Sequence, residues 1–426
     1  DWKPRWILGG GWNRNVLSDP MALDKSILDH IFPDIPVALF SKDYHSKLCS
    51  SKALSIAGIT GNTLDPVGGR IERDITGEPT GVLFETAAET LDRFIVPAPQ
   101  SIIVRAVQEA VEDMYLNGLA GFHTMENQVS KDILLAAQSQ GSRFRFCWHF
   151  QTTDLDSVIE TGKCSYTGDE WYKLGGLKLF TDGSLGSRTA AMYEDYTGEP
   201  GNKGILRYTD DELYALAEMA AQHGLSTTIH AIGDRAVKQV IQMITKLNLH
   251  PQYKYLSHRI EHVQSIRLAD IDKLKQTGML ASLQPVHLAN DVPMIEAFWS
   301  DIKEEVYPFK SLIHAGIPYA FGSDAPIETM NPFAGIYTAL ERKQGLSRDA
   351  VTWRPQERIP VDVAISGYTM GSALASCSQD VLGSIDKGKY ADLIILEDFR
   401  ELPSSYWLEA HSLFTMVGGK VVYSSL

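Results

Sequence analysis

Long apolar runs, clustered cysteines and an excess of positive charge are all missing from this 426-residue sequence. No apolar run approaches the roughly 20 residues that a transmembrane helix needs, so a membrane-spanning protein is not expected. The four cysteines are scattered and form no Cys-x-x-Cys pair, which argues against a disulfide framework and against a thiolate zinc site. The formal net charge of -14 disfavours binding to nucleic acid or to an anionic membrane surface, because both need clustered Lys and Arg.

The composition that remains is typical of a soluble globular enzyme, with 44% hydrophobic and 22% charged residues. Scattered cysteines fit a reducing compartment, so a cytoplasmic location is expected. The first residues, Asp1-Trp2-Lys3-Pro4, include neither an initiator Met nor a signal-peptide pattern. We therefore expect that a segment has been removed upstream.

The pattern of apolar residues, Gly and Pro along the sequence changes near residue 100. Residues 1–100 are rich in Gly and Pro and predict a loop-rich region with short strands and helices. From there on, strand-like runs alternate with amphipathic helices, which indicates parallel β/α units. The seven runs are 119–124, 144–150, 176–181, 225–230, 255–262, 279–284 and 317–322. Seven strands are one short of a (β/α)8 barrel, and a doubly wound sheet is the alternative.

The end of the chain predicts a different kind of structure. A helix is expected at about 361–376, followed by short alternating runs near 391–396 and 415–423. Such runs around turns are typical of antiparallel strands, so a small β layer is expected beside the β/α units.

Lys178 lies in one of the apolar strand-like runs, where an ammonium group is costly to bury. Carboxylation of its amine would resolve the problem, because the product is a carboxylate able to bridge metal ions. This hypothesis needs further metal ligands from the rest of the chain.

Three other strand-like runs end in or near a metal-binding side chain: His230, His262 and Asp324. Reacting groups of β/α barrels come from the carboxyl ends of several strands, and neutral imidazoles with carboxylates suit zinc. A single strand histidine is more often a hydrogen-bonded core residue. Four candidate ligands from separate units favour a metal site.

Several segments closely resemble the metal-dependent amidohydrolase superfamily, and within it the branch of N-substituted formamide deformylase and the YtcJ-like proteins. They are 178–190, 229–234, 258–262, 321–326 and 388–393, with further similarity at 9–12 and 77–82. The resemblance implies a (β/α)8 TIM-type barrel with a small β-sandwich built from both chain ends. It also implies that Lys178, His230 and His262 are metal ligands, with Lys178 carboxylated, and that Asp324 binds metal and acts catalytically by moving a proton.

One family feature is absent. Members of this superfamily begin the barrel with a His-x-His pair on strand 1, and the 12 histidines here include no such spacing. We therefore expect strand 1 to be missing and the chain to hold three regions: 1–100 between strands 1 and 2, 101–376 as the barrel, and 377–426 as the C-terminal part of the sandwich. At most one divalent metal ion, preferably zinc, is expected here, against one or two in the full-length enzyme.

Six residues are predicted to contact substrate because they lie near expected strand ends or in family-like segments. They are His45, His123, Asp182, Arg188, Gln284 and His287. His258, four residues before His262, is expected to be a structural core residue instead.

The expected function is metal-dependent hydrolysis, through a metal-activated water, of carbon–nitrogen bonds other than peptide bonds, in small amide- or formamide-type substrates. A homodimer would be ordinary for such a barrel. The alternative is a non-catalytic barrel, because the His-x-His ligands are absent. A phosphate-binding barrel is disfavoured, since Asp324 would repel phosphate.

Overall fold

The computed structural model describes residues 6–17, 23–399 and 402–426. The chain divides into two compact units, one of residues 1–99 with 182–209 and one of residues 100–181 with 210–426. The first hundred residues thus share a unit with a later segment that the sequence did not associate with them.

The first unit contains a five-stranded mixed sheet in the order β1-β2-β3-β5-β4, in which β1 runs parallel to β2 and the other pairs are antiparallel. Its strands are β1 (Ile7–Trp12), β2 (Val37–Ser41), β3 (Ser46–Cys49), β4 (Gly69–Arg73) and β5 (Pro79–Glu85), and its helices are α1 (Lys25–Ile31), α2 (Ser51–Ala57) and α3 (Thr86–Glu89). Alternate residues of β5 enter two separate apolar clusters, Leu83 in one and Val82 with Phe84 in the other. Because successive strand residues point to opposite faces, both faces of this sheet are covered.

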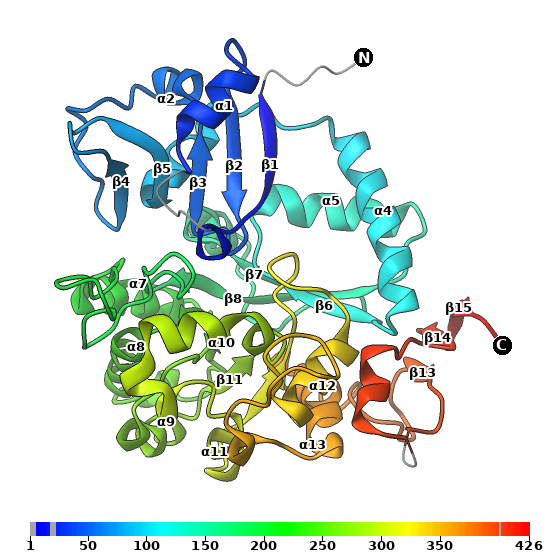
Figure 1. Ribbon diagram of the computed structural model, residues 1–426. Coiled ribbons are helices and arrows are strands. Elements are labelled where there is room, and N and C mark those ends of the chain that lie inside the picture. The colour runs from blue at the N-terminus through cyan, green and yellow to red at the C-terminus, as the bar shows by residue number, and fades with distance from the viewer. Residues whose placement is uncertain (1–5, 18–22, 400–401) are drawn as a thin grey trace. The chain divides into compact units, whose positions relative to one another are not determined.

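The second unit is built on seven parallel strands in the order β12-β11-β10-β9-β8-β7-β6. Figure 1 labels β6, β7, β8 and β11 of this sheet. They are β6 (Gly121–Thr124), β7 (Arg145–Phe150), β8 (Tyr172–Phe180), β9 (Thr227–Ala231), β10 (Arg259–His262), β11 (Leu280–Leu283) and β12 (Tyr319–Phe321). Each overlaps a run predicted from the sequence, although β8 begins four residues before its run and β9 ends one residue after its run. The order follows the chain without a reversal, so the doubly wound alternative is wrong.

The seven-stranded sheet is strongly curled. Strands β10 and β6 are four positions apart, which would separate them by roughly 19 Å in a flat sheet. Nevertheless Arg259 Nη1 on β10 lies 2.6 Å from His123 Nδ1 on β6. The curl brings inward-facing side chains of distant strands together, as in a barrel wall.

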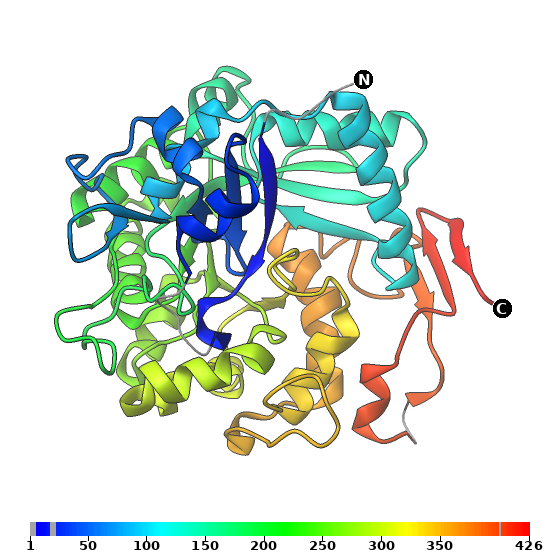
Figure 2. The same cartoon turned by 45° about the horizontal axis from the view of Figure 1, so that its top comes forward.

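Helices alternate with these strands, and Figure 2 shows the same elements from a second direction. They are α4 (Gln100–Leu116), α5 (Gln128–Ser139), α6 (Leu155–Glu160), α7 (Asp210–Gln222), α8 (Asp234–Leu247), α9 (Ile271–Thr277), α10 (His287–Phe298), α11 (Phe309–His314) and α12 (Pro332–Glu341). In α8 the buried residues Val237, Val240, Ile241 and Ile244 follow the helical period and form one apolar stripe. Gly278, at φ 74°, ends α9 in a left-handed conformation and leads into β11.

The helix predicted at 361–376 is not regular. It consists of α13 (Val361–Ser366), a π-helical turn (Gly367–Gly371) and α14 (Ser372–Ala375). Gly367 and Gly371 pack against β12, where a Cβ on Gly371 would lie 2.5 Å from the Tyr319 carbonyl oxygen. The close approach of this segment to β12 requires residues without side chains.

A three-stranded antiparallel sheet of β13 (Leu393–Ile395), β14 (Phe414–Val417) and β15 (Lys420–Ser424) ends the chain, as expected for a small β layer. It is the orange and red sheet of Figure 2. Among the residues that the structure describes, no helix combines the length and apolarity needed to cross a membrane.

Candidate active site

Three predicted ligands lie on consecutive strands of the curled sheet. Lys178 is near the end of β8, His230 is next to last in β9 and His262 ends β10. All three are buried, with 3%, 2% and 6% of their surface exposed. The rings of His230 and His262 meet edge to face, with centroids 4.6 Å apart.

The other predicted residues follow the next two strands. Gln284 comes directly after β11, His287 begins α10, and Asp324 follows β12. Gln284 Oε1 accepts a hydrogen bond from His262 Nδ1 at 2.9 Å, which leaves the lone pair of His262 on Nε2. On the neighbouring histidine, Nε2 of His287 lies 3.9 Å from Asp324 Oδ2.

Three residues at or beside this site have unusual backbone conformations. His262, Val263 and Asp324 have φ angles of 75°, 46° and 56°, in the left-handed region that non-glycine residues avoid. Left-handed conformation is especially unfavourable for a β-branched residue such as Val263. Strain of this kind clusters at functional sites, where the surrounding structure holds it in place.

Burial decides the charge of the basic groups. It lowers the pKa of Lys178 to about 8, against the opposing effect of the Glu261 and Asp324 carboxylates. Burial and the neighbouring His230 also keep the pKa of His262 well below 6.5. His262 is therefore a neutral imidazole at physiological pH, which is the form that binds metal ions.

The donor set fits a divalent transition metal ion. Within the described part of the chain, the ligand atoms of His262, His287 and Asp324 all lie within 4.8 Å of one another. Nε2 of His287 is buried and has no hydrogen-bond partner. Two imidazoles with one carboxylate form a ligand set that zinc uses in hydrolytic enzymes.

A buried arginine lies among the inward-facing side chains of four strands. Arg259 donates to Glu261 Oε1 at 2.8 Å and to Ser282 Oγ at 3.1 Å, and its Nη1 lies within 3.1 Å of His123 Nδ1 and His149 Nε2. Arg259 and Glu261 were not among the site residues predicted from the sequence. Their i, i+2 spacing on a buried strand was the available signal, because it puts both on one face.

His123, predicted to contact substrate, belongs to this cluster of polar side chains around Arg259. Burial and the Arg259 guanidinium lower the pKa of His123 to about 3. With Cys147 and His149 it forms a second group of closely spaced ligand atoms. That group does not fit a metal cation, because the positively charged Arg259 guanidinium already contacts the rings of His123 and His149 and would repel the ion.

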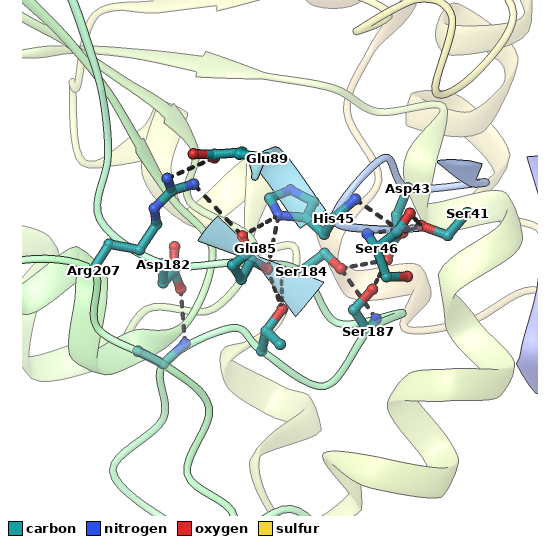
Figure 3. A network of polar contacts seen from close by, with 12 residues as sticks. Ser41, Asp43, His45, Ser46, Glu85, Glu89, Asp182, Ser184, Ser187 and Arg207 are labelled. Carbon is teal, nitrogen blue, oxygen red and sulfur yellow. Dashed lines mark hydrogen bonds and ion pairs between the residues drawn. The ribbon is translucent and has the colours of Figure 1, made fainter. Parts of the chain in front are cut away.

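The predicted substrate residues His45, Asp182 and Arg188 belong to the first unit. His45 Nδ1 lies 3.0 Å from Glu85 Oε2, and Asp43 accepts hydrogen bonds from Ser184 and Ser187 (Figure 3). Asp182 is fully buried and accepts from the Ala191 amide at 2.8 Å, while Arg188 forms an ion pair with Glu199.

Charges compensate one another within this network. Burial would lower the pKa of His45, but the Glu85 and Asp43 carboxylates raise it to about 9. Arg207 adds a second cation, donating to Glu89 at 2.7 Å and lying 3.6 Å from Glu85. The network links segment 182–209 to the strands of the first unit.

The chain matches the amidohydrolase family and two of its relatives over nearly its whole length. Residues 2–423 match the model of the amidohydrolase family. YtcJ of Bacillus subtilis (strain 168) is 33% identical over 99% of this chain and 80% of its own length. The N-substituted formamide deformylase of Arthrobacter pascens is 24% identical over 98% of this chain and 79% of its own length.

A solved structure has a similar fold. An uncharacterized metal-dependent hydrolase from Pyrococcus horikoshii OT3 superimposes with a TM-score of 0.71, at 26% identity, over 91% of this chain and 76% of that one. Fold and sequence thus define the class as that of metal-dependent hydrolases. The chain belongs to the amidohydrolase family, and the resemblance described from the sequence is confirmed.

Proposed function

We propose that the protein hydrolyses carbon–nitrogen bonds other than peptide bonds in small amide- or formamide-type substrates, with one divalent metal ion, preferably zinc. The placement of Lys178, His230 and His262 near the carboxyl ends of three consecutive parallel strands carries the proposal, together with Asp324, which follows β12. Family membership and the similarity to a formamide deformylase support the choice of bond.

In the proposed mechanism Lys178, His230, His262 and Asp324 would hold the ion, with Lys178 becoming a ligand after carboxylation. When bound, the ion supplies Lewis-acid polarisation of a carbonyl oxygen and lowers the pKa of a water molecule. The hydrogen bond from His262 to Gln284 keeps the ring orientation and tautomer that such a role needs.

Asp324 has the proton-transfer role in this proposal. Its carboxylate takes a proton from the attacking water and delivers it to the leaving nitrogen, since an amine anion is too basic to leave unprotonated. The side chain is 39% exposed, so water and substrate can reach its oxygens.

The finer architecture is part of the proposal. We infer a (β/α)8-type barrel over 101–376, an insertion over 1–100 and a β-sandwich contribution from 377–426. The substrate contacts predicted for His45, His123, Asp182, Arg188, Gln284 and His287 remain predictions as well.

A hydrolysis screen tests the function. Zinc-loaded protein would be offered N-substituted formamides, N-acyl amino acids and cyclic amides, with Asp324→Asn measured in parallel. Turnover that needs Asp324 is expected in one class. No turnover in any class by folded, zinc-loaded protein would favour the non-catalytic alternative.

A further inference from the structure

The first unit contains a cluster of three arginines and two glutamates, made of Arg14, Arg70, Glu72, Arg188 and Glu199. Arg14 donates to Glu72 through Nη1 at 2.7 Å and through Nη2 at 2.9 Å. Arg188 forms an ion pair with Glu199, with Nε 2.8 Å from Oε1. Both glutamates are therefore already paired, and among the described residues no carboxylate pairs with Arg70.

Strand geometry and one side-chain contact bring the cluster together. Arg70 and Glu72 are two residues apart on the edge strand β4, so both side chains project from the same face. Asn15, which directly follows the first arginine in the chain, donates to the Gly186 carbonyl oxygen at 3.0 Å. This contact joins the segment after β1 to the loop that holds Arg188.

The Arg70 guanidinium stacks on an aromatic ring. Its Cζ lies 4.4 Å from the ring centroid of Phe84, the residue that faces Arg70 on β5. Stacking covers a face of the planar guanidinium and leaves its N–H edge for a bidentate contact with an oxyanion. The side chain is partly exposed, yet its Nε is buried and has no hydrogen-bond partner. The edge of Arg70 thus lacks an acceptor from the chain.

A second N–H group in the cluster is also unsatisfied. Arg14 is 7% exposed, and its Nε has no hydrogen-bond partner. Native proteins rarely retain buried donors without an acceptor, because such donors have lost their hydration and gained nothing in return. Burial lowers the pKa of Arg70, and the positive charges of Arg188 and Arg14 act in the same direction, against the opposing effect of the two glutamates. An anion beside Arg70 would relieve this repulsion.

The charges of the cluster favour a monoanion. Three guanidinium groups against two carboxylates leave one positive charge. One added carboxylate would neutralise it, whereas a dianion such as phosphate would reverse it next to Glu72 and Glu199. The two oxygens of a carboxylate also match the fork of a guanidinium, which a single halide ion does not.

We propose that Arg70, beside Arg14 and Arg188, binds the carboxylate group of a small organic acid. The site belongs to the first unit and uses none of the predicted metal ligands, so the inference goes beyond the proposed function. Arg188, predicted from the sequence to contact substrate, stays paired with Glu199 and contributes positive charge to this site.

Propionate binding tests the inference without any activity measurement. The full chain, loaded with zinc, would be titrated with sodium propionate at constant ionic strength, and the affinity would be derived from the rise in melting temperature. Propionamide has the same shape without the charge, and inorganic phosphate supplies a dianion. We expect a saturable rise with propionate, no rise with propionamide, and at least threefold weaker binding of phosphate.

Substitutions of Arg70 separate recognition from general charge. Arg70→Gln should bind propionate at least tenfold more weakly, and Arg70→Lys should also bind more weakly, because an ammonium group keeps the charge but loses the fork. Arg93 is a matched control in the same unit, since it also stacks on a phenylalanine, Phe94, at 4.7 Å but is exposed. Arg93→Gln should bind propionate as the unsubstituted protein does.

Glu199→Gln provides a variant in which binding should improve. It removes one negative charge from the cluster and frees Arg188, so propionate should bind more tightly, which a loss of folding cannot produce. Unchanged or weaker binding by this variant would contradict the inference. Equal affinities of Arg70→Gln and the unsubstituted protein would overturn it, as would tighter binding of phosphate than of propionate. Because no readout uses turnover, the site and the proposed hydrolysis can fail independently.

Discussion

Asp324 is the residue on which the proposed chemistry depends most. Removal of a general acid–base group lowers rates by about 10²–10⁴-fold. We therefore expect Asp324→Asn to lower kcat by at least 10² on any substrate found in the screen, with an unchanged far-ultraviolet circular dichroism spectrum. Asp301→Asn makes the same charge change at an exposed position and should leave kcat within twofold.

His45 gives a prediction about pH. Its pKa of about 9 in the folded protein exceeds the 6.5 expected in the unfolded chain, so protonation stabilises the folded state. This contribution is complete below pH 6.5 and is lost as the pH rises through 9. His45→Gln keeps a hydrogen-bond donor for Glu85 but removes the charge.

The free energies of unfolding of the unsubstituted protein and of the His45→Gln variant, measured by denaturant titration, should therefore differ most near pH 6. The difference should shrink on the order of 2–3 kcal/mol by pH 9.5. A difference that does not change between these pH values would show that the His45 charge contributes nothing to stability.

At the scale of single residues, the sequence pointed to candidate metal ligands more readily than to the residues that lie beside them in the fold. Lys178, His230, His262 and Asp324 stood out because polar residues at the ends of apolar strands are hard to explain by packing. The convergence of His287 with Asp324 could not be read from the sequence, since it depends on the left-handed backbone at Asp324 and on the loop between β11 and α10.

Among the elements, β10 has the most consequential pair. Arg259 and Glu261 are 3% and 1% exposed and bind each other at 2.8 Å. Removing one partner of a buried ion pair leaves the other uncompensated and costs about 3–5 kcal/mol. We expect Arg259→Met to lose this much stability in denaturant unfolding, and the double variant Arg259→Met with Glu261→Gln to recover most of it. No recovery would mean that Arg259 acts mainly through His123 and His149.

The π-helical turn beside β12 gives a second prediction for an element. A Cβ at Gly371 would lie 2.5 Å from the Tyr319 carbonyl oxygen, so Gly371→Ala must push this segment away from β12. Such overpacking costs about 1–3 kcal/mol. Gly322, at the end of the same strand, has nothing within 4 Å of a Cβ, and Gly322→Ala should change thermal stability little. Equal melting temperatures for the two variants would contradict the steric explanation.

Elements were predictable where periodicity was strong. All seven strands of the second unit and helices such as α8 follow from runs of apolar residues at spacing 2 or 3.6. The interruption of the helix at 361–376 was not predictable, because it is imposed by tertiary contact of two glycines with β12.

For the whole molecule, strand order and unit composition are separate problems. The sequential order of seven parallel strands follows from alternating β/α units, because each crossover places the next strand beside the last. The partnership of 182–209 with the first hundred residues arises from contacts such as Ser184 and Ser187 with Asp43, which have no periodic signal.

Metal dependence of hydrolysis tests the central claim most directly. Protein stripped by chelation would be given increasing zinc, and the initial rate of amide or formamide hydrolysis would be followed against the zinc-to-protein ratio. We predict no turnover without metal and a rate that rises up to about one equivalent and then levels off. Hydrolysis that proceeds equally in the stripped and zinc-loaded protein would contradict the proposal that a metal held at the carboxyl ends of these strands performs the chemistry.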